Sequence, residues 1–197
     1  MSIYLIRHGE TAGNHERRIQ LPEIPLNERG VEQARRLGAR LAGVGITRIL
    51  SSDYQRAAMT AEAVSHASGV PVEPEPLLRE RNFGDDRGRL WSEIPGGLFA
   101  ADYHPKGGES WRDFHERGER AWAAVSEIAR RSQGDLAIVT HGLLIHTILQ
   151  RCVTLPREVS YDADGAQVAS QVRNTSVTRI GSSAPWRVEL LACTAHL

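Results

Sequence analysis

The sequence contains little cysteine and no long apolar run. Its 197 residues include two cysteines, Cys152 and Cys193, which show no Cys-x-x-Cys spacing, so we expect free thiols rather than a disulfide or a metal pair. No apolar stretch approaches the roughly 18 residues that a membrane span needs. The chain opens on residues 3–6, an apolar strand-like run, without a basic leader or an apolar signal core. These absences predict a cytoplasmic protein that does not span a membrane.

An excess of charge of either sign is also missing. The 24 basic residues balance the 24 acidic residues, and the sequence pI is about 7.1. This balance does not suggest a nucleic-acid partner or a membrane surface. Lysine is nearly absent, because Lys106 is the single lysine, and arginine is the general cation of this chain. An isolated arginine is therefore weak evidence for anion binding.

What the chain does contain is an alternation of strand and helix patterns. Short apolar runs predict strands at residues 3–6, 46–50, 70–72, 136–139, 168–172, 176–180 and 187–191. Apolar residues three and four apart predict helices at residues 31–44, 55–67, 109–131 and 143–152. The alternation predicts an α/β fold of three layers, with a mostly parallel central sheet and helices on both faces.

The chain length suits one domain spanning residues 1–197. Residues 74–110 interrupt the alternation and are rich in proline, glycine, charge and aromatic side chains, so we expect an excursion over the functional site. Within the helix at 31–44, the spacing places Val31 on the buried face. Ser51-Ser52-Asp53 offers capping side chains for the helix that follows.

Two predicted strands end in the same way. Residues 3–6 lead into Arg7-His8-Gly9, and residues 136–139 lead into Thr140-His141-Gly142. Since α/β proteins bind ligands at the carboxyl edge of the sheet, we expect both imidazoles in one site. Arg7 and Asn14 add donors suited to a tetrahedral oxyanion such as phosphate.

The candidate residues have distinct chemical roles. His8 is the candidate nucleophile, because a neutral imidazole attacks phosphorus and its phosphoramidate product is labile enough to be hydrolysed. Its other ring nitrogen must be held by a hydrogen bond that fixes the tautomer. Arg56 opens a helix whose N-terminus favours anions. His141, if protonated, adds positive charge and a donor, and Gly142 is counted with the phosphate-binding residues.

The reaction also needs a carboxyl group that protonates the leaving oxygen and later deprotonates water. Glu80 lies in a loop that is expected to reach the site, and Asp85, Asp86 and Glu109 are competitors. Spacing alone does not choose among the four residues, and Asp85 is kept as the reserve candidate.

The motifs around these candidates resemble the histidine phosphatase superfamily, the phosphoglycerate-mutase-like proteins. The most specific motif is Arg7-His8-Gly9-Glu10-Thr11-x-x-Asn14. The resemblance continues in order, over nearly the whole chain, through Pro25-Leu26, Gly30, Gln33-Ala34, Ser51-Ser52-Asp53, Arg56-Ala57, Thr60-Ala61, Glu80, Phe83-Gly84, Gly107-Gly108-Glu109-Ser110, Thr140-His141-Gly142 and Asn174-Thr175-Ser176-Val177.

The resemblance implies a phosphoglycerate-mutase-like fold and a role for each matching residue. It makes His8 the phosphate acceptor and Glu80 the proton donor and acceptor. It implies that Arg7, Arg56 and His141 complete the phosphate pocket, that Asn14 assists, and that neither a metal nor an organic cofactor is needed. This chain departs from the usual pattern at two places, which are Asp85-Asp86-Arg87-Gly88, where relatives often have an acidic residue and Trp-Glu-Gly, and Ser52, where proline or aspartate is usual.

Several functions are compatible with these residues. The resemblance favours a phosphatase that hydrolyses a small phosphomonoester metabolite through a phosphohistidine, because the glycolytic mutases of the family are longer and carry an added basic segment, whereas residues 84–110 are aromatic, acidic and glycine-rich, with one lysine. The resemblance leaves a phosphoglycerate-type phosphomutase as the alternative, and a non-catalytic phosphate-binding module as a weaker one. A metal hydrolase is disfavoured, because His141 and His146 are five residues apart rather than the four that one helix face requires. The oligomeric state stays open between monomer and homodimer.

Overall fold

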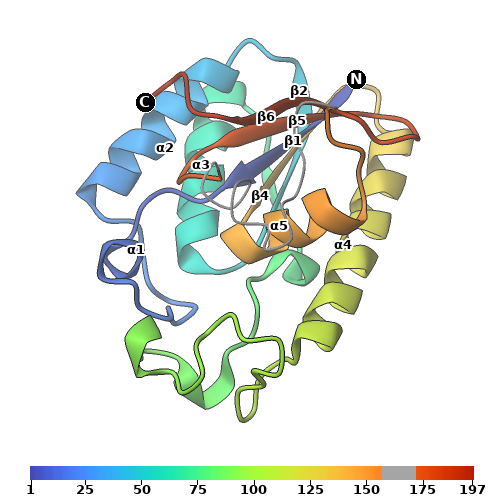
Figure 1. Ribbon diagram of the computed structural model, residues 1–197. Helices are drawn as coiled ribbons and strands as arrows, with labels where there is room; N and C mark the ends of the chain where they lie inside the picture. Colours follow the sequence, from blue (N-terminus) through green and yellow to red (C-terminus); the bar gives the residue numbers. More distant parts are fainter. Residues whose placement is uncertain (157–171) are drawn as a thin grey trace.

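The protein is built on one mixed sheet covered by helices. The computed structural model describes residues 1–156 and 172–197 (Figure 1). Its strands are β1 (Ser2–Arg7), β2 (Ile46–Ser51), β3 (Val72–Pro74), β4 (Asp135–Thr140), β5 (Val177–Gly181) and β6 (Val188–Cys193). Its helices are α1 (Ala12–Glu16), α2 (Glu28–Leu41), α3 (Gln55–Ser68), α4 (Trp111–Arg131) and α5 (Gly142–Arg151).

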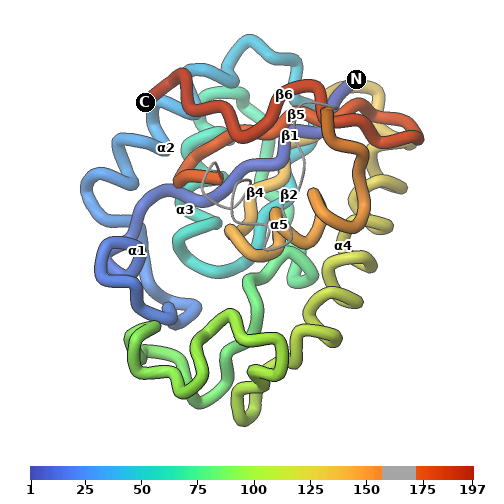
Figure 2. The backbone as a smooth tube through the Cα atoms, in the orientation of Figure 1, coloured from blue at the N-terminus to red at the C-terminus, as the bar shows by residue number. Residues whose placement is uncertain are grey.

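The sheet places the carboxyl ends of three strands side by side. The strand order is β3-β2-β4-β1-β5-β6, and β3, β2, β4 and β1 run parallel, whereas β5 is antiparallel to β1. Arg7 at the end of β1 is paired with Thr140 of β4, and Ser51 at the end of β2 is paired with Val139. The trace in Figure 2 shows β1 and β4 at the centre of the sheet. Residues that follow these ends share one edge.

Helices pack on both faces of the sheet, which confirms the predicted three-layer α/β fold. On one face, Phe114 of α4 and Ile145 of α5 pack with Leu5 of β1 in the larger core cluster. On the other face, Leu37 of α2 and Ala61 of α3 pack with strand residues such as Ile49. The parallel strands are apolar on both sides because both sides are covered.

Local sequence explains where the long helices begin. Asn27 precedes α2 and accepts a hydrogen bond from the Gly30 amide, and Ser110 precedes α4 in a reciprocal capping box with Asp113.

The strands β5 and β6 match the predicted runs at 176–180 and 187–191 within a few residues. The predicted strand at 168–172 lies outside the described residues except for Val172. None of the described helices combines the length and the apolarity needed to cross a bilayer.

Two local predictions are wrong. Val31 is 49% exposed rather than buried. The buried face of α2 carries Gly30 and Ala34 instead, and Val31 lies in a surface groove that residues of α3 also line. The residue that caps α3 is Tyr54, which makes no side-chain capping bond. The predicted capping residues are engaged elsewhere, since Ser52 bonds His141 and Asp53 pairs with Arg79.

The segment between β3 and α4 crosses the carboxyl edge of the sheet as an irregular chain with short 3-10 turns, including Gly84–Asp86 and Trp91–Glu93. Backbone hydrogen bonds attach it to the chain that follows α1. The Ile19 amide donates to the Arg89 carbonyl at 2.9 Å, and the Trp91 amide donates to the Arg17 carbonyl at 2.9 Å. These bonds hold the segment over the strand ends.

Candidate active site

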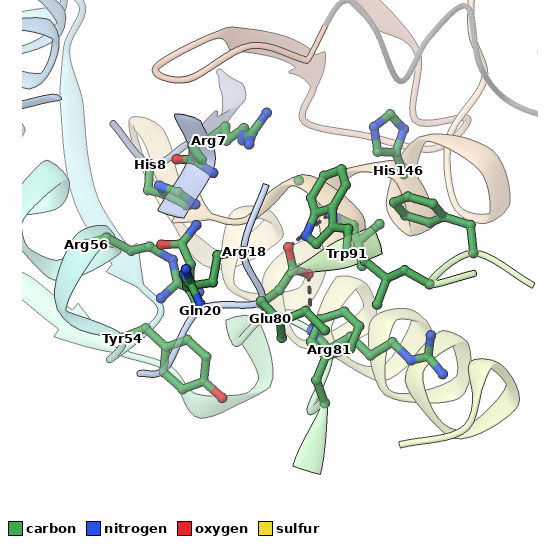
Figure 3. Close-up of a pocket in the computed structure, with 17 residues that line it drawn as sticks. Arg7, His8, Arg18, Gln20, Tyr54, Arg56, Glu80, Arg81, Trp91 and His146 are labelled. Carbon is green, nitrogen blue, oxygen red and sulfur yellow. Dashed lines mark hydrogen bonds between the residues drawn. The ribbon is translucent and has the colours of Figure 1, made fainter. Parts of the chain in front are cut away.

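A cavity of about 300 Å³ opens at the carboxyl edge of the sheet, beneath this segment. Segments far apart in the chain supply its walls, as Figure 3 shows for His8 after β1, Arg56 of α3 and Glu80 of the loop after β3. The residues that line it are Arg7, His8, Asn14, Arg18, Ile19, Gln20, Tyr54, Arg56, Glu80, Arg81, Phe83, Trp91, Leu98, Phe99, Gly142, Leu143 and His146. This set includes every predicted catalytic or phosphate-binding residue except His141.

His8 is held in one orientation. Its Nδ1 atom lies 2.7 Å from the Gly9 carbonyl oxygen, so Nδ1–H is the donor and Nε2 carries the free lone pair. The His8 side chain is 3% exposed. Burial, reinforced by the charges of Arg56 and Arg7, lowers the pKa of His8 well below its usual value of 6.5. The imidazole is therefore neutral at neutral pH, which a nucleophile requires.

The backbone around His8 is fixed by residues of the family-like motifs. The Thr60 hydroxyl accepts from the Gly9 amide at 3.0 Å. The Asn174 side chain donates to the His8 carbonyl at 3.0 Å, and the Thr175 amide donates to the same oxygen at 3.2 Å. Gly30 packs so closely on Glu10 that a Cβ at Gly30 would lie 2.0 Å from the Glu10 carbonyl oxygen. The loop that carries His8 is therefore rigid before any ligand arrives.

Two arginines present unpartnered donors beside this cavity. The Arg7 and Arg56 Nε atoms are both buried and make no hydrogen bond within the described residues. Nη1 of Arg7 donates to the Val172 carbonyl at 2.7 Å, and Nη1 of Arg56 donates to the Leu21 carbonyl at 3.1 Å. Burial lowers the pKa of Arg56 to about 10, so it remains a cation at neutral pH. Unpartnered buried cationic donors need an anion, and a phosphoryl group supplies one.

His141 lies next to His8 but is not among the residues that line the cavity. It is fully buried, and its ring centroid lies 5.1 Å from that of His8. Nε2 is 2.8 Å from the Ser52 hydroxyl oxygen, while Nδ1 is buried without a partner among the described residues. Burial, followed by the charge of Arg56, lowers the pKa of His141 well below 6.5. The protonated form considered from sequence is therefore not favoured in the ligand-free protein, where His141 is a neutral imidazole.

Glu80 is the carboxyl group that reaches the cavity. Its Oε2 accepts from the Leu143 amide at 3.2 Å, and its Oε1 accepts from the Arg81 amide at 3.1 Å. Burial raises the pKa of Glu80 above its usual value of 4.5, against the opposing effect of these bonds and of the two arginines. A raised pKa suits a group that donates a proton and then takes one back.

The three competing carboxylates are placed elsewhere. The Asp85 side chain is 70% exposed and pairs with Lys106 at 3.8 Å, outside the cavity. Asp86 bonds Arg89 and Tyr103, and Glu109 forms a two-bond pair with the Arg117 guanidinium. Of the four carboxyl groups that sequence spacing did not distinguish, the fold places only Glu80 in the lining of this cavity.

Asn14 and Gly142 complete the predicted set. The Asn14 oxygen accepts from the Thr11 amide at 3.2 Å and from the Asn174 side chain at 3.1 Å, which leaves its amide N–H groups as the donors. Gly142 is the first residue of α5, so the N-terminus of this helix meets the cavity, where its Leu143 amide donates to Glu80. A Cβ on Gly142 would lie 3.6 Å from the Arg7 guanidinium carbon, which is ordinary van der Waals contact, so this position lies directly against Arg7.

Sequence reasoning missed the residues that hold and extend the site. Ser52, treated as a departure from the family pattern, is the hydrogen-bond partner of His141. Tyr54 is buried, and its ring and that of His141 meet in an edge-to-face arrangement. The Arg56 guanidinium lies over the face of the Tyr54 ring. His146, one helical turn beyond Gly142, also lines the cavity, and burial lowers its pKa to about 4. The spacing of His146 from Gly142 was the one signal that could have found it.

The side chains that line the cavity do not form a typical set of metal ligands. Among the residues that the structure describes, no group of three or more His, Cys, Asp or Glu side chains is arranged to hold a metal ion. The donors that converge are cationic or neutral N–H groups, which bind oxyanions and repel cations.

The fold and the site together define a class, namely an α/β protein with a cavity lined by arginine and histidine side chains at the carboxyl edge of its sheet. The chain belongs to the histidine phosphatase superfamily, branch 1, whose family model matches residues 3–185.

Relatives with different activities share this architecture. The chain is 30% identical over its whole length to a protein of Salmonella newport named "Probable phosphoglycerate mutase GpmB", covering 95% of that protein. A phosphoglycerate mutase from Bacillus anthracis is 28% identical and superposes with a TM-score of 0.79, covering 100% of this chain and 94% of that one. A mycobacterial glucosyl-3-phosphoglycerate phosphatase solved with VO3 is 27% identical with a TM-score of 0.79, covering 98% and 99%.

Proposed function

We propose that this protein is a phosphatase that hydrolyses a small phosphomonoester metabolite through a phosphohistidine at His8. One observation carries the proposal. A neutral imidazole, fixed through Nδ1 so that Nε2 is free, lies in a cavity with the unpartnered donors of Arg7 and Arg56. This arrangement binds an oxyanion and places a nucleophile beside its phosphorus. The VO3 complex of the mycobacterial phosphatase supports it, because vanadate resembles a phosphoryl group.

The chemistry follows from the positions of these groups. The His8 Nε2 lone pair forms a bond to phosphorus as the bond to the leaving oxygen breaks, and Glu80 gives that oxygen its proton. A water molecule then attacks the phosphohistidine, the Glu80 carboxylate takes a proton from it, and the P–N bond breaks to release inorganic phosphate. Arg7 and Arg56 bind the phosphoryl oxygens in both steps, and His141, whose ring lies beside that of His8, contributes its unpartnered Nδ1 atom once the phosphoryl group is bound.

The mutase alternative has an observation in its favour, since two of the relatives carry phosphoglycerate mutase names. Apolar side chains of the cavity wall argue for hydrolysis. Ile19, Phe83 and Leu98 are buried in one cluster of that wall, whereas phosphoglycerate has no apolar body that would pack against them. Such a wall is compatible with an apolar or ring-containing leaving group.

One pair of assays decides between these functions. Purified protein is mixed with p-nitrophenyl phosphate, and inorganic phosphate release is measured. It is also mixed with 3-phosphoglycerate, and the products are followed by ³¹P NMR. We expect inorganic phosphate to be released from p-nitrophenyl phosphate. With 3-phosphoglycerate, we expect inorganic phosphate as the product rather than 2-phosphoglycerate. Predominant isomerisation would assign the mutase function, and no reaction in either assay would favour a phosphate-binding module.

A further inference from the structure

A second cavity, of about 390 Å³, adjoins the candidate active site. It is lined by Glu16, Arg17, Leu90, Trp91, Ser92, Leu98 and Phe99. Three of these residues, Trp91, Leu98 and Phe99, also line the first cavity. The two cavities are therefore adjacent and share one apolar wall.

The shared wall is an aromatic pair held in place by backbone bonds. The rings of Trp91 and Phe99 meet edge to face, with centroids 5.6 Å apart and an interplanar angle of 89°. Trp91 is 39% exposed and Phe99 is 58% exposed, although Leu98 between them is buried. The Trp91 amide donates to the Arg17 carbonyl, which fixes the wall to the end of α1. A rigid exposed aromatic surface at the mouth of a site favours a flat apolar ligand.

The charge in the second cavity is positive. Glu16 and Arg17 are its two charged lining residues. The Glu16 carboxylate accepts a hydrogen bond from Nε of Arg18 at 2.9 Å, so its charge is compensated. The Arg17 side chain is exposed and has no ion pair or hydrogen bond with the described residues. The uncompensated guanidinium complements a negative group on a ligand.

From this juxtaposition we propose that the natural substrate has an elongated leaving group, with a flat apolar body on Trp91 and Phe99 and an anionic end at Arg17. The inference rests on the proposed phosphatase function and specifies its substrate class. The phosphoryl group occupies the first cavity, the apolar body lies along the shared wall, and the far anion occupies the second cavity. Arg17 and Phe99 are then specificity residues that do not touch the reacting atoms.

Three substrates test this assignment by kcat/KM. These are 6-carboxy-2-naphthyl phosphate, 2-naphthyl phosphate and glycerol 1-phosphate. Arg17→Gln should lower the ratio of the first to the second about threefold, as expected for an exposed ion pair. Phe99→Ala should lower the ratio of the second to the third about tenfold, because it removes an aromatic contact. Ratios cancel differences in folding or in leaving-group acidity.

Arg112→Gln is the matched control, because Arg112 is 86% exposed on α4 and lines neither cavity. Both ratios should stay at their wild-type values in this variant. Unchanged ratios in Arg17→Gln and Phe99→Ala, with all three substrates hydrolysed, would overturn the inference.

If the wild-type protein hydrolyses none of the three substrates, the proposed function fails and the subsite is tested by binding. Calorimetric titration with 6-carboxy-2-naphthyl phosphate should then show about threefold weaker affinity in Arg17→Gln than in wild type. Equal affinities would reject the subsite independently of catalysis.

Discussion

The imidazole rings of His8 and His141 lie with centroids 5.1 Å apart and planes inclined by 59°. The two residues are 133 positions apart in the chain, and the parallel pairing of β1 with β4 brings them together. Both are neutral in the ligand-free site, because burial lowers the pKa of each well below 6.5. In the proposed reaction, the positive charge that attracts the phosphoryl group therefore comes from Arg7 and Arg56, and both histidines act as neutral imidazoles.

The first prediction concerns His8. We expect His8→Ala to abolish turnover, because no phosphoryl acceptor remains at that position. Wild-type protein quenched during turnover of ³²P-labelled substrate should carry phosphate that is labile in acid and stable in base, and the variant should carry none. Circular dichroism of the variant checks that it is folded. Active wild-type enzyme without this adduct would contradict covalent catalysis.

The second prediction separates the two carboxyl candidates. Glu80→Gln should slow hydrolysis of an alkyl phosphate about a hundredfold, as expected for loss of general acid catalysis. It should slow p-nitrophenyl phosphate far less, since p-nitrophenolate departs with little help. Asp85→Asn is the control, because Asp85 is exposed and outside the cavity, and its rates should match wild type. Selective loss in Asp85→Asn instead would reassign the proton shuttle.

The third prediction concerns the geometry of Arg56. Arg56→Lys keeps the positive charge, but lysine cannot offer a planar pair of donors. We expect kcat/KM to fall about tenfold or more, which corresponds to the loss of a charge-assisted hydrogen bond. The comparison variant is Arg36→Lys, on the outer side of α2 and paired with Glu32, which should retain wild-type activity. Steady-state kinetics on p-nitrophenyl phosphate measures both, and full activity in Arg56→Lys would remove Arg56 from the phosphate site.

The fourth prediction concerns packing behind the nucleophile loop. A Cβ at Gly30 would lie 2.0 Å from the Glu10 carbonyl oxygen, so Gly30→Ala forces the α2 N-terminus and the loop apart. We expect a loss of about 2 kcal/mol in the free energy of unfolding, together with reduced activity. Gly43→Ala serves as the control, because a Cβ at Gly43 would meet no atom within 4 Å. Urea denaturation measures both variants, and equal stabilities would refute the packing argument.

The fifth prediction concerns pH. Burial lowers the folded-state pKa of His146 to about 4 from an ordinary value of 6.5. Between these values the unfolded chain binds a proton that the folded chain does not, so the free energy of unfolding falls as pH decreases from 6.5 and is level above it. His146→Gln should therefore lose about 2 kcal/mol less stability between pH 7 and pH 5 than wild type. Urea denaturation of both proteins at pH 7 and at pH 5 measures this difference, and equal losses of stability would contradict it.

Much of the fold and the core of the site could be predicted from the sequence. The periods of apolar residues are local, so the strands that end at His8 and His141 and the long helices such as α4 were predicted within a few residues. A strand end followed by a polar residue, a histidine and a glycine is also a local pattern. The histidine phosphatase assignment followed from such patterns.

Contacts between distant segments decided the rest. Sequence spacing could not separate Glu80 from Asp85, because their difference lies in burial and in the Leu143 amide that Glu80 meets. It could not show that His141 is neutral, since a pKa depends on desolvation and on charges brought close by the fold. The shared Trp91 and Phe99 wall likewise exists only because the segment before α4 is bonded to the end of α1. The residue types and their order determined which chemistry is possible, and burial and proximity in the folded chain assigned it to particular side chains.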